Sequence, residues 1–154
     1  MQRVWTRVVN GSLAAPFLLA GCTGGEPLHR FVFEPEAVAP QTTALTLAAG
    51  ESLSFWNSLD LTYQTDTTLN FVITVQPEAQ APIEILCDAL NPTSEFMTTT
   101  ITTGNIVKKS WKIARMKCGF GPMEKRQTVT ITAVPKATGT VPLEAKRLVL
   151  ELKP

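Results

Sequence analysis

Histidine is nearly absent from this chain of 154 residues, since His29 is the single one. It lies ahead of the strand-like segments described below. Sites that need a histidine inside a folded domain are therefore excluded, including a Ser-His-Asp triad, a Cys-His pair and the usual zinc ligand sets. No glycine-rich loop of the phosphate-binding type is present either. The commonest hydrolase and metalloenzyme designs do not fit this sequence.

A long hydrophobic run is also missing. The most apolar segment, residues 8–19, is interrupted at residues 10–12 and at Pro16. A helix of about 12 residues is near 18 Å long, which is short of a hydrocarbon core of roughly 30 Å. Arg3 and Arg7 precede this segment, and small residues and Cys22 follow it. This order is typical of an export signal rather than of a membrane span.

The sequence Leu19-Ala20-Gly21-Cys22 resembles the lipobox of bacterial lipoprotein signal peptides, and the resemblance covers the leader of residues 1–21. It implies cleavage before Cys22, a diacylglyceryl thioether on the Cys22 thiol, and acylation of the new amino group, for example with palmitate. Two or three acyl chains give a durable membrane anchor. Thr23 is not the aspartate that retains many such proteins in the inner membrane, so the resemblance implies the outer membrane, facing the periplasm. An ordinary secretory leader and a buried amino-terminal helix are the alternatives.

Cysteine is scarce, and after Cys22 only Cys87 and Cys118 remain. An even pair in a chain exported to an oxidising compartment predicts a disulfide bond. The closed loop of about 31 residues corresponds to roughly 3.5 to 4 kcal/mol in the chain-entropy model. Two free buried thiols are the alternative. No CxxC motif is present for redox or zinc chemistry.

The sequence after the leader predicts a tether followed by one all-β domain. Residues 22–41 hold two glycines and three prolines, which indicates a flexible tether, although residues 31–33 are a candidate first edge strand. In residues 42–154, short alternating segments separated by turn residues predict an antiparallel β-sandwich of seven to nine strands. We expect these strands at residues 44–47, 53–63, 69–75, 83–87, 96–103, 106–118, 128–134 and 147–152.

Two of these segments are irregular. An apparent change of phase at Trp56-Asn57 suggests a bulge within residues 53–63. Residues 106–118 also fit a helix, because one helix face would hold Val107, Trp111, Ala114 and Cys118. The neighbouring strands favour a strand with a bulge there.

Charge is segregated along a nearly neutral chain. The sequence has 14 Lys and Arg against 13 Asp and Glu, and without Arg3 and Arg7 the balance is 12 to 13. This balance gives no general attraction to nucleic acid. Residues 31–107 hold nine acidic residues and no Lys or Arg, whereas basic residues gather just after them. We call this segment the basic strip and define it by Lys108, Lys109, Trp111, Lys112, Arg115 and Lys117. The strip either binds an anionic headgroup, a glycan or an acidic protein, or it pairs with acidic strands of the same sheet.

Carboxylates and aromatic residues offer weaker candidate sites. Asp60, Asp66, Glu84 and Asp88 are the candidates for a glycosidase-type pair, but such residues are more often solvated strand faces. Asp60, Asp66 and Asp88 are too scattered for an EF-hand calcium loop. Trp56 and Tyr63 are candidates for a sugar-stacking platform, although aromatic residues on strands are more often core.

Together these patterns predict a non-enzymatic lipoprotein of the bacterial cell envelope that needs no cofactor or metal. Its expected role is a binding or accessory module of an envelope protein assembly. A glycan- or lipid-binding module is the alternative, and an envelope hydrolase is the least favoured. An exposed apolar patch or edge strand would favour the first, a concave aromatic groove the second, and a cleft with paired carboxylates the third.

Overall fold

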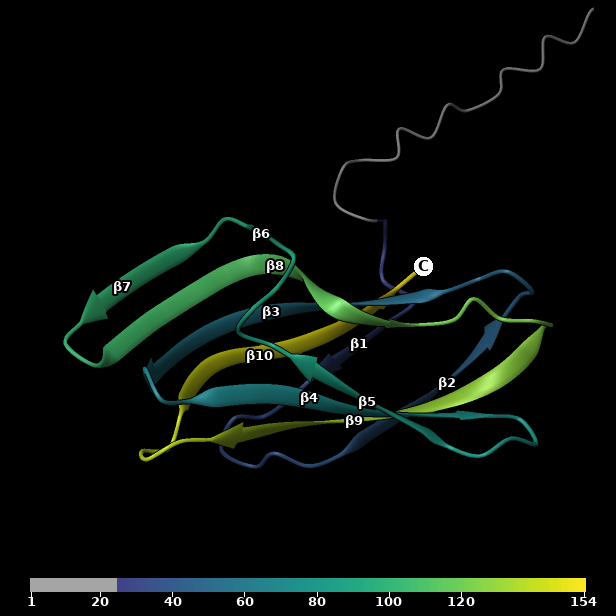
Figure 1. Cartoon of the computed structure of the whole chain (residues 1–154), viewed down its shortest axis with the longest axis horizontal. Helices are drawn as coiled ribbons and strands as arrows, with labels where there is room; N and C mark the ends of the chain where they lie inside the picture. The colour runs from purple at the N-terminus through teal and green to yellow at the C-terminus, as the bar shows by residue number, and fades with distance from the viewer. Residues whose placement is uncertain (1–24) are drawn as a thin grey trace, which may run out of the picture.

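The computed structural model describes residues 25–154, which form two antiparallel sheets packed face to face (Figure 1). The leader of residues 1–21 and Cys22 lie outside the described residues. Within residues 25–154 no helix is long and apolar enough to cross a membrane. The predicted all-β sandwich is confirmed, with ten strands in place of seven to nine: β1 (His29–Val32), β2 (Gln41–Leu47), β3 (Leu53–Gln64), β4 (Thr68–Pro77), β5 (Ile83–Asp88), β6 (Ser94–Phe96), β7 (Thr99–Thr103), β8 (Ile106–Phe120), β9 (Gln127–Thr138) and β10 (Glu144–Lys153).

The order of strands in the six-stranded sheet is β1-β10-β3-β8-β6, with β7 also paired to β8. The four-stranded sheet has the order β2-β9-β4-β5. Alternation in the sequence places one face of each strand in the core between the sheets. On β4 the buried residues are Leu69, Phe71, Ile73 and Val75, and on β10 they include Leu148, Leu150 and Leu152. Both patterns match the sequence expectation.

The irregularity expected within β3 lies in its partner β8. Strand β3 alternates without interruption from Leu53 to Leu61, and Asn57 takes a fully buried position in that series. Between Ser54 and Trp56, and again between Asn57 and Leu59, the register against β8 shifts because β8 holds the extra residues. Residues 106–120 are thus a strand with bulges, as predicted for residues 106–118. The ladder is irregular on both sides of Trp56-Asn57, near the expected place, but the extra residues belong to β8.

The sandwich begins earlier than the predicted boundary at residue 42. Strand β1 lies within the expected tether, pairs with β10, and buries Phe31 in the core. Two side-chain bonds then connect β1 to β2 in the other sheet. The Gln41 amide donates to the Val32 carbonyl at 2.7 Å, and the Thr43 hydroxyl lies 3.3 Å from Nδ1 of His29. These bonds join the two sheets along one side of the sandwich.

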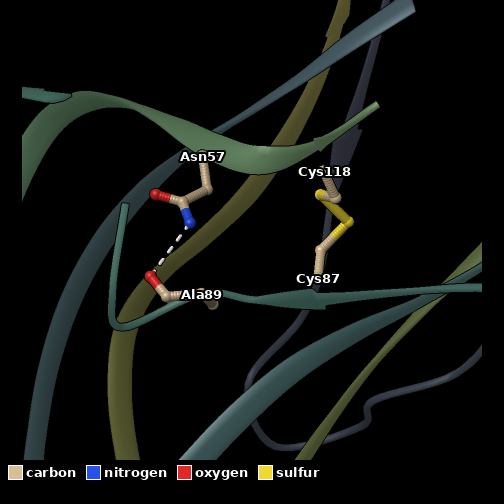
Figure 2. The surroundings of a disulfide bond; sticks show 4 residues. All are labelled: Asn57, Cys87, Ala89 and Cys118. Carbon is tan, nitrogen blue, oxygen red and sulfur yellow. Dashed lines mark hydrogen bonds between the residues drawn. A yellow bond between two sulfur atoms is a disulfide. The ribbon is translucent and has the colours of Figure 1, made fainter. Parts of the chain in front are cut away.

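On the opposite side a disulfide joins β5 to β8, as Figure 2 shows. Cys87 and Cys118 form the predicted bond, with Cα atoms 5.6 Å apart. Beside it, the amide nitrogen of Asn57 donates to the Ala89 carbonyl at 3.2 Å, and Nε1 of Trp111 donates to the Asn57 carbonyl oxygen at 2.5 Å. This buried side chain therefore links β3, β8 and the residue that follows β5.

We predict that loss of the disulfide lowers the free energy of unfolding by about 3.5 to 4 kcal/mol, because it releases a loop of 31 residues in the unfolded chain. Urea unfolding of the Cys87→Ala, Cys118→Ala double variant measures this change. Adding reductant should destabilise the parent chain and leave the double variant unaffected. Equal stability of parent and double variant would contradict a stabilising bond.

We also predict that Asn57→Leu destabilises the fold by on the order of 2 to 4 kcal/mol, because it leaves the Trp111 indole N–H and the Ala89 carbonyl unpaired. Adding Trp111→Phe removes one of these orphaned groups. The double variant should then be less destabilised than the sum of the two single variants by about 1 kcal/mol. Asn70→Leu, at a half-buried position of β4, is the control and should have a smaller effect. Strict additivity would argue against the Asn57 network.

Candidate functional site

The end of the six-stranded sheet at β7 extends past the four-stranded sheet (Figure 1). We call this part the hairpin arm, defined as β7, the turn at Gly104-Asn105 and residues 106–110 of β8. All five residues of β7 are exposed, so both faces of this strand are open to solvent. The prediction of one continuous strand at residues 96–103 is wrong. This segment is divided into β6 and β7, because Met97 adopts a left-handed backbone with a φ of 55°.

Apolar side chains are concentrated on and beside this arm. Ile101 is 56 % exposed, and Ile106, which pairs with Thr103, is its diagonal neighbour on the adjacent strand. Phe96 and Met97 are also exposed where β6 leads into β7. A shallow pocket is lined by Ile101, Thr103, Ile106 and Lys108. An exposed edge strand with apolar side chains is the feature that the sequence analysis associated with docking to a protein partner.

The structure divides the basic strip between the two faces of β8. Trp111 is only 1 % exposed and belongs to the core, so the expectation of an aromatic residue at the centre of an exposed strip is wrong. Lys109 covers the Trp111 ring, with its Nζ 4.9 Å from the ring centroid. Lys109 shares the inner face with Trp111, whereas the bulge between Trp111 and Ala114 brings Arg115 to the same outer face as Lys108. The exposed members of the strip are Lys108, Lys112, Arg115 and Lys117.

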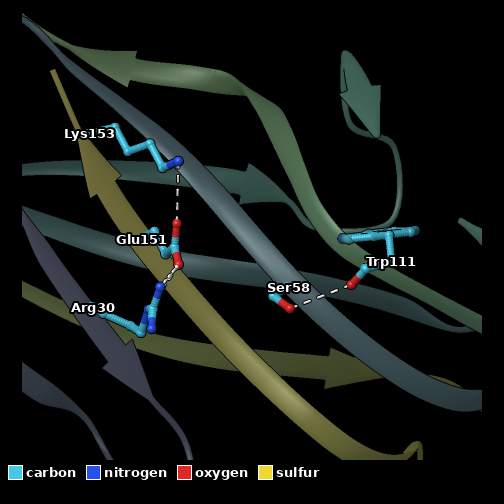
Figure 3. A network of polar contacts seen from close by, with 5 residues as sticks. All are labelled: Arg30, Ser58, Trp111, Glu151 and Lys153. Atoms are coloured by element: carbon cyan, nitrogen blue, oxygen red, sulfur yellow. Dashed lines mark hydrogen bonds and ion pairs between the residues drawn. The ribbon is translucent and has the colours of Figure 1, made fainter. Parts of the chain in front are cut away.

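Cross-strand pairing with acidic residues does not account for these cations. Within residues 25–154 the ion pairs are Arg30 with Glu151 at 2.5 Å and Lys153 with Glu151 at 3.5 Å. Figure 3 shows this group on β1 and β10. None of the Lys and Arg residues of the basic strip pairs with a carboxylate in that part of the chain. Their charges are therefore available to an anionic partner.

A second polar group fills the gap that a β8 bulge opens. The Trp111 carbonyl accepts from Nη2 of Arg147 at 3.0 Å and from the Ser58 hydroxyl at 3.4 Å. Arg147 also donates to the Leu59 carbonyl at 3.1 Å. A register shift in β10 between Ala145 and Arg147 precedes this residue. Side chains thus replace strand-to-strand bonds where the ladder between β3 and β8 is interrupted.

The two aromatic residues considered for sugar stacking do not form one platform. Seven positions separate Trp56 from Tyr63 on β3, so the two side chains point to opposite faces of the sheet. The Trp56 ring already lies under two cations, with Nζ of Lys153 at 4.8 Å and the Arg115 guanidinium at 5.9 Å from its centroid. Tyr63 packs partly against the core.

The candidate carboxylates are also dispersed. Asp60 lies on β3, and Glu84 lies on β5 in the other sheet. Asp66 accepts from the Thr140 hydroxyl and from the backbone N–H of Thr140 at 3.0 Å, and these bonds, the first more than the second, lower its pKa. Asp88 accepts from the Leu90 N–H at 2.9 Å, which fixes the chain after β5. Residues 25–154 hold no group of three or more His, Cys, Asp or Glu side chains that fits a metal ion.

Sequence reasoning missed three of the residues described here. Asn57 occupies a position where the regular alternation of β3 calls for an apolar residue. In the sequence, only that position indicates that Asn57 is buried and needs hydrogen-bond partners. Arg147 fills a bulge that no local pattern reveals. Met97, which separates β6 from β7, adopts a backbone that its side chain does not favour.

Tyr63 provides a direct test of the packing beside the hairpin arm, because it is the only tyrosine. Burial raises its pKa above the usual value of 10.0, and the Glu95 carboxylate adds to this. The folded state therefore favours the neutral phenol. The contribution of neutral Tyr63 to the free energy of unfolding is complete below pH 10, and it is lost as the pH rises through the pKa of Tyr63 in the folded state. Ultraviolet titration of the phenol should give one midpoint above 10.

Glu95→Gln should move that midpoint only part of the way toward 10, because burial is the larger cause. Glu124→Gln, an exposed position in the loop before β9, is the control and should leave the midpoint unchanged. A parent midpoint at or below 10 would contradict this packing of Tyr63.

Comparison of the chain with protein-family models, with curated proteins and with solved structures gave no match.

Proposed function

We propose that this chain is a bacterial envelope lipoprotein, acylated at Cys22, whose β-sandwich acts as a non-enzymatic binding module close to a membrane. The observation that supports this proposal most is the sequence Leu19-Ala20-Gly21-Cys22, which ends only seven positions before β1 begins at His29. A lipid anchor and a folded domain are thus almost contiguous in the chain. The outer membrane, facing the periplasm, is the proposed location on the ground of Thr23.

The length of the connection limits how far the domain stands from its anchor. An extended chain spans at most about 3.3 to 3.6 Å per residue, so seven residues reach about 25 Å. The tether expected over residues 22–41 would have reached about 70 Å. Because β1 pairs with β10, residues 29–32 belong to the sandwich and are not available as linker. The proposed anchor therefore holds one end of the sandwich near the membrane surface.

The disulfide supports an oxidising compartment. Bonds such as that between Cys87 and Cys118 persist in secreted and periplasmic proteins and are rare in the reducing cytosol. This agrees with export through a leader of the lipoprotein class.

The hairpin arm is the proposed contact region, because it lies at the far end of the sheet from the proposed anchor. His29 pairs with Leu152, which pairs with Phe55 of β3, whereas the tip of the arm lies where Gln64 pairs with Ile106. Nine residues of β3 separate these two places, which is about 30 Å at the usual strand rise. The arm therefore combines distance from the membrane, an open edge, and lysine side chains that form no ion pair within residues 25–154.

We predict that Cys22→Ser moves the protein from the detergent-extracted membrane fraction to the soluble fraction or leaves an unprocessed precursor, because serine cannot form the thioether. Intact mass spectrometry of the parent protein should give the mass of residues 22–154 plus diacylglyceryl and acyl groups. The mass should rise by about two hydrogens when the Cys87–Cys118 bond is reduced.

Thr23→Ser, a change of the neighbouring residue, is the matched control and should remain acylated and membrane-bound. Retention of the Cys22→Ser chain in the membrane at the parent level would refute the anchor. An unmodified full-length mass for the parent would refute it as well.

A further inference from the structure

We propose that the partner of the hairpin arm is a second copy of this chain, and that the two copies associate by antiparallel pairing of their β7 strands around a two-fold axis at Ile101. The inference rests on the proposed function only in taking the arm as a contact region. It joins two six-stranded sheets edge to edge into one continuous sheet.

Strand β7 lacks the features that normally protect an edge strand. Natural edges are blocked by charged residues, proline, bulges or a covering segment. The edge strands β1, β5 and β6 carry charged residues, namely Arg30, Glu84 with Asp88, and Glu95. Strand β7 has the sequence Thr-Thr-Ile-Thr-Thr, pairs with β8 without a register shift, and is fully exposed.

Strand β2 is the other uncharged edge, but it differs from β7 in its surroundings. Its alternate residues are half-buried against the core, and Gln41 and Thr43 bond across to β1. This edge is therefore already engaged within the chain. Within residues 25–154, β7 is the uncharged edge without such contacts.

The sequence of β7 is the same in both directions around Ile101. In antiparallel pairing about a two-fold axis at that residue, Ile101 lies opposite Ile101 of the second copy. Thr99 then lies opposite Thr103, and Thr100 lies opposite Thr102. The strand is therefore complementary to itself, which is the requirement for a symmetric contact between identical chains.

Cross-strand threonine pairs of this kind already occur within the sandwich. Thr42 and Thr132 face each other on β2 and β9 with hydroxyl oxygens 2.8 Å apart, and Thr46 and Thr128 do so at 3.2 Å. Thr68 and Thr138 form a third pair, on β4 and β9. Pairing of two β7 strands would add four more Thr–Thr pairs of this kind. Each contributes a few tenths of a kcal/mol or more to a sheet.

The lysine residues of the arm do not oppose this arrangement. Lys108 lies opposite Ile101, one strand inside the edge. Three strand spacings of about 4.8 Å would separate it from Lys108 of the second copy, or about 14 Å. This exceeds the Debye length of about 8 Å at physiological ionic strength. Salt screens the repulsion, while the apolar Ile101 pair lies on the axis.

A contact of five residues per chain is small compared with the roughly 1,200 to 2,000 Å² of a stable interface. Association is therefore weak in dilute solution and depends on a high local concentration. Confinement of both copies to one membrane supplies such a concentration. The test is accordingly made with the full chain in isolated membranes.

The experiment uses single cysteine substitutions and mild oxidation, with dimers counted on a non-reducing gel. Directly opposed strand residues have Cβ atoms about 4.5 to 5.5 Å apart, and diagonal neighbours about 7 to 8 Å. Ile101→Cys should therefore cross-link to itself efficiently. Thr100→Cys and Thr102→Cys alone are the matched controls, and each should give at least about tenfold less dimer, because each is diagonal to its own copy. Coexpression of these two variants should restore cross-linking.

Absence of a dimer for Ile101→Cys would overturn the proposal, and so would equal cross-linking at positions 100, 101 and 102. Formation of the Cys87–Cys118 bond in each variant shows that the chain has folded. Failure of the proposed anchor appears separately, as recovery of the parent chain in the soluble fraction. Repeating the test with the full chain carrying Cys22→Ser at high protein concentration should still give the Ile101→Cys dimer. Its absence there at concentrations that match the membrane would count against pairing through β7.

Discussion

The attachment of β8 to both sheets is the constraint on which the rest of the structure depends. Asn57 is fully buried and binds the Trp111 indole on one side and the Ala89 carbonyl on the other. The bond between Cys87 and Cys118 fixes the same strand to β5 farther along. Strand β7 of the hairpin arm covers no part of the core, since it is exposed on both faces. Its position is therefore set by the part of β8 that these two contacts hold.

The bulges of β8 decide which of its side chains are displayed. Each extra residue interrupts the ladder to β3 and leaves a backbone group to be paired by other means. An unpaired buried carbonyl costs about 1 to 3 kcal/mol, and Arg147 and Ser58 avoid this cost at Trp111. The bulge between Trp111 and Ala114 also brings Arg115 to the outer face that Lys108 occupies, while Lys109 stays on the inner face. The distribution of lysine around the arm is thus a consequence of how β8 is paired.

The sequence predicted the sandwich and its disulfide because β4 and β10 alternate cleanly and because two cysteines remain after the leader. It predicted β8 poorly, since a bulge replaces the period of two by a spacing of three between Trp111 and Ala114, and a lysine, Lys109, takes the inward position between Val107 and Trp111. It also placed Trp56 beside Tyr63, although an odd separation on one strand sends them to opposite faces. The short β1 was assigned to the tether because prolines surround it. Its signal was the pair Phe31 and Phe33, which are both buried.

An exposed hairpin must obtain its order from its neighbours. Fixing the backbone of one residue costs about 1 to 2 kcal/mol, and an isolated two-stranded hairpin is marginal in water. In the single chain, pairing with β8 is what stabilises the ordered backbone of β7, because neither face of β7 is covered. A strand added at its free edge would change β7 from an edge strand to an interior strand. Ordering of the arm and association through it are therefore expected to reinforce each other, so the absence of a core beneath β7 favours contact there.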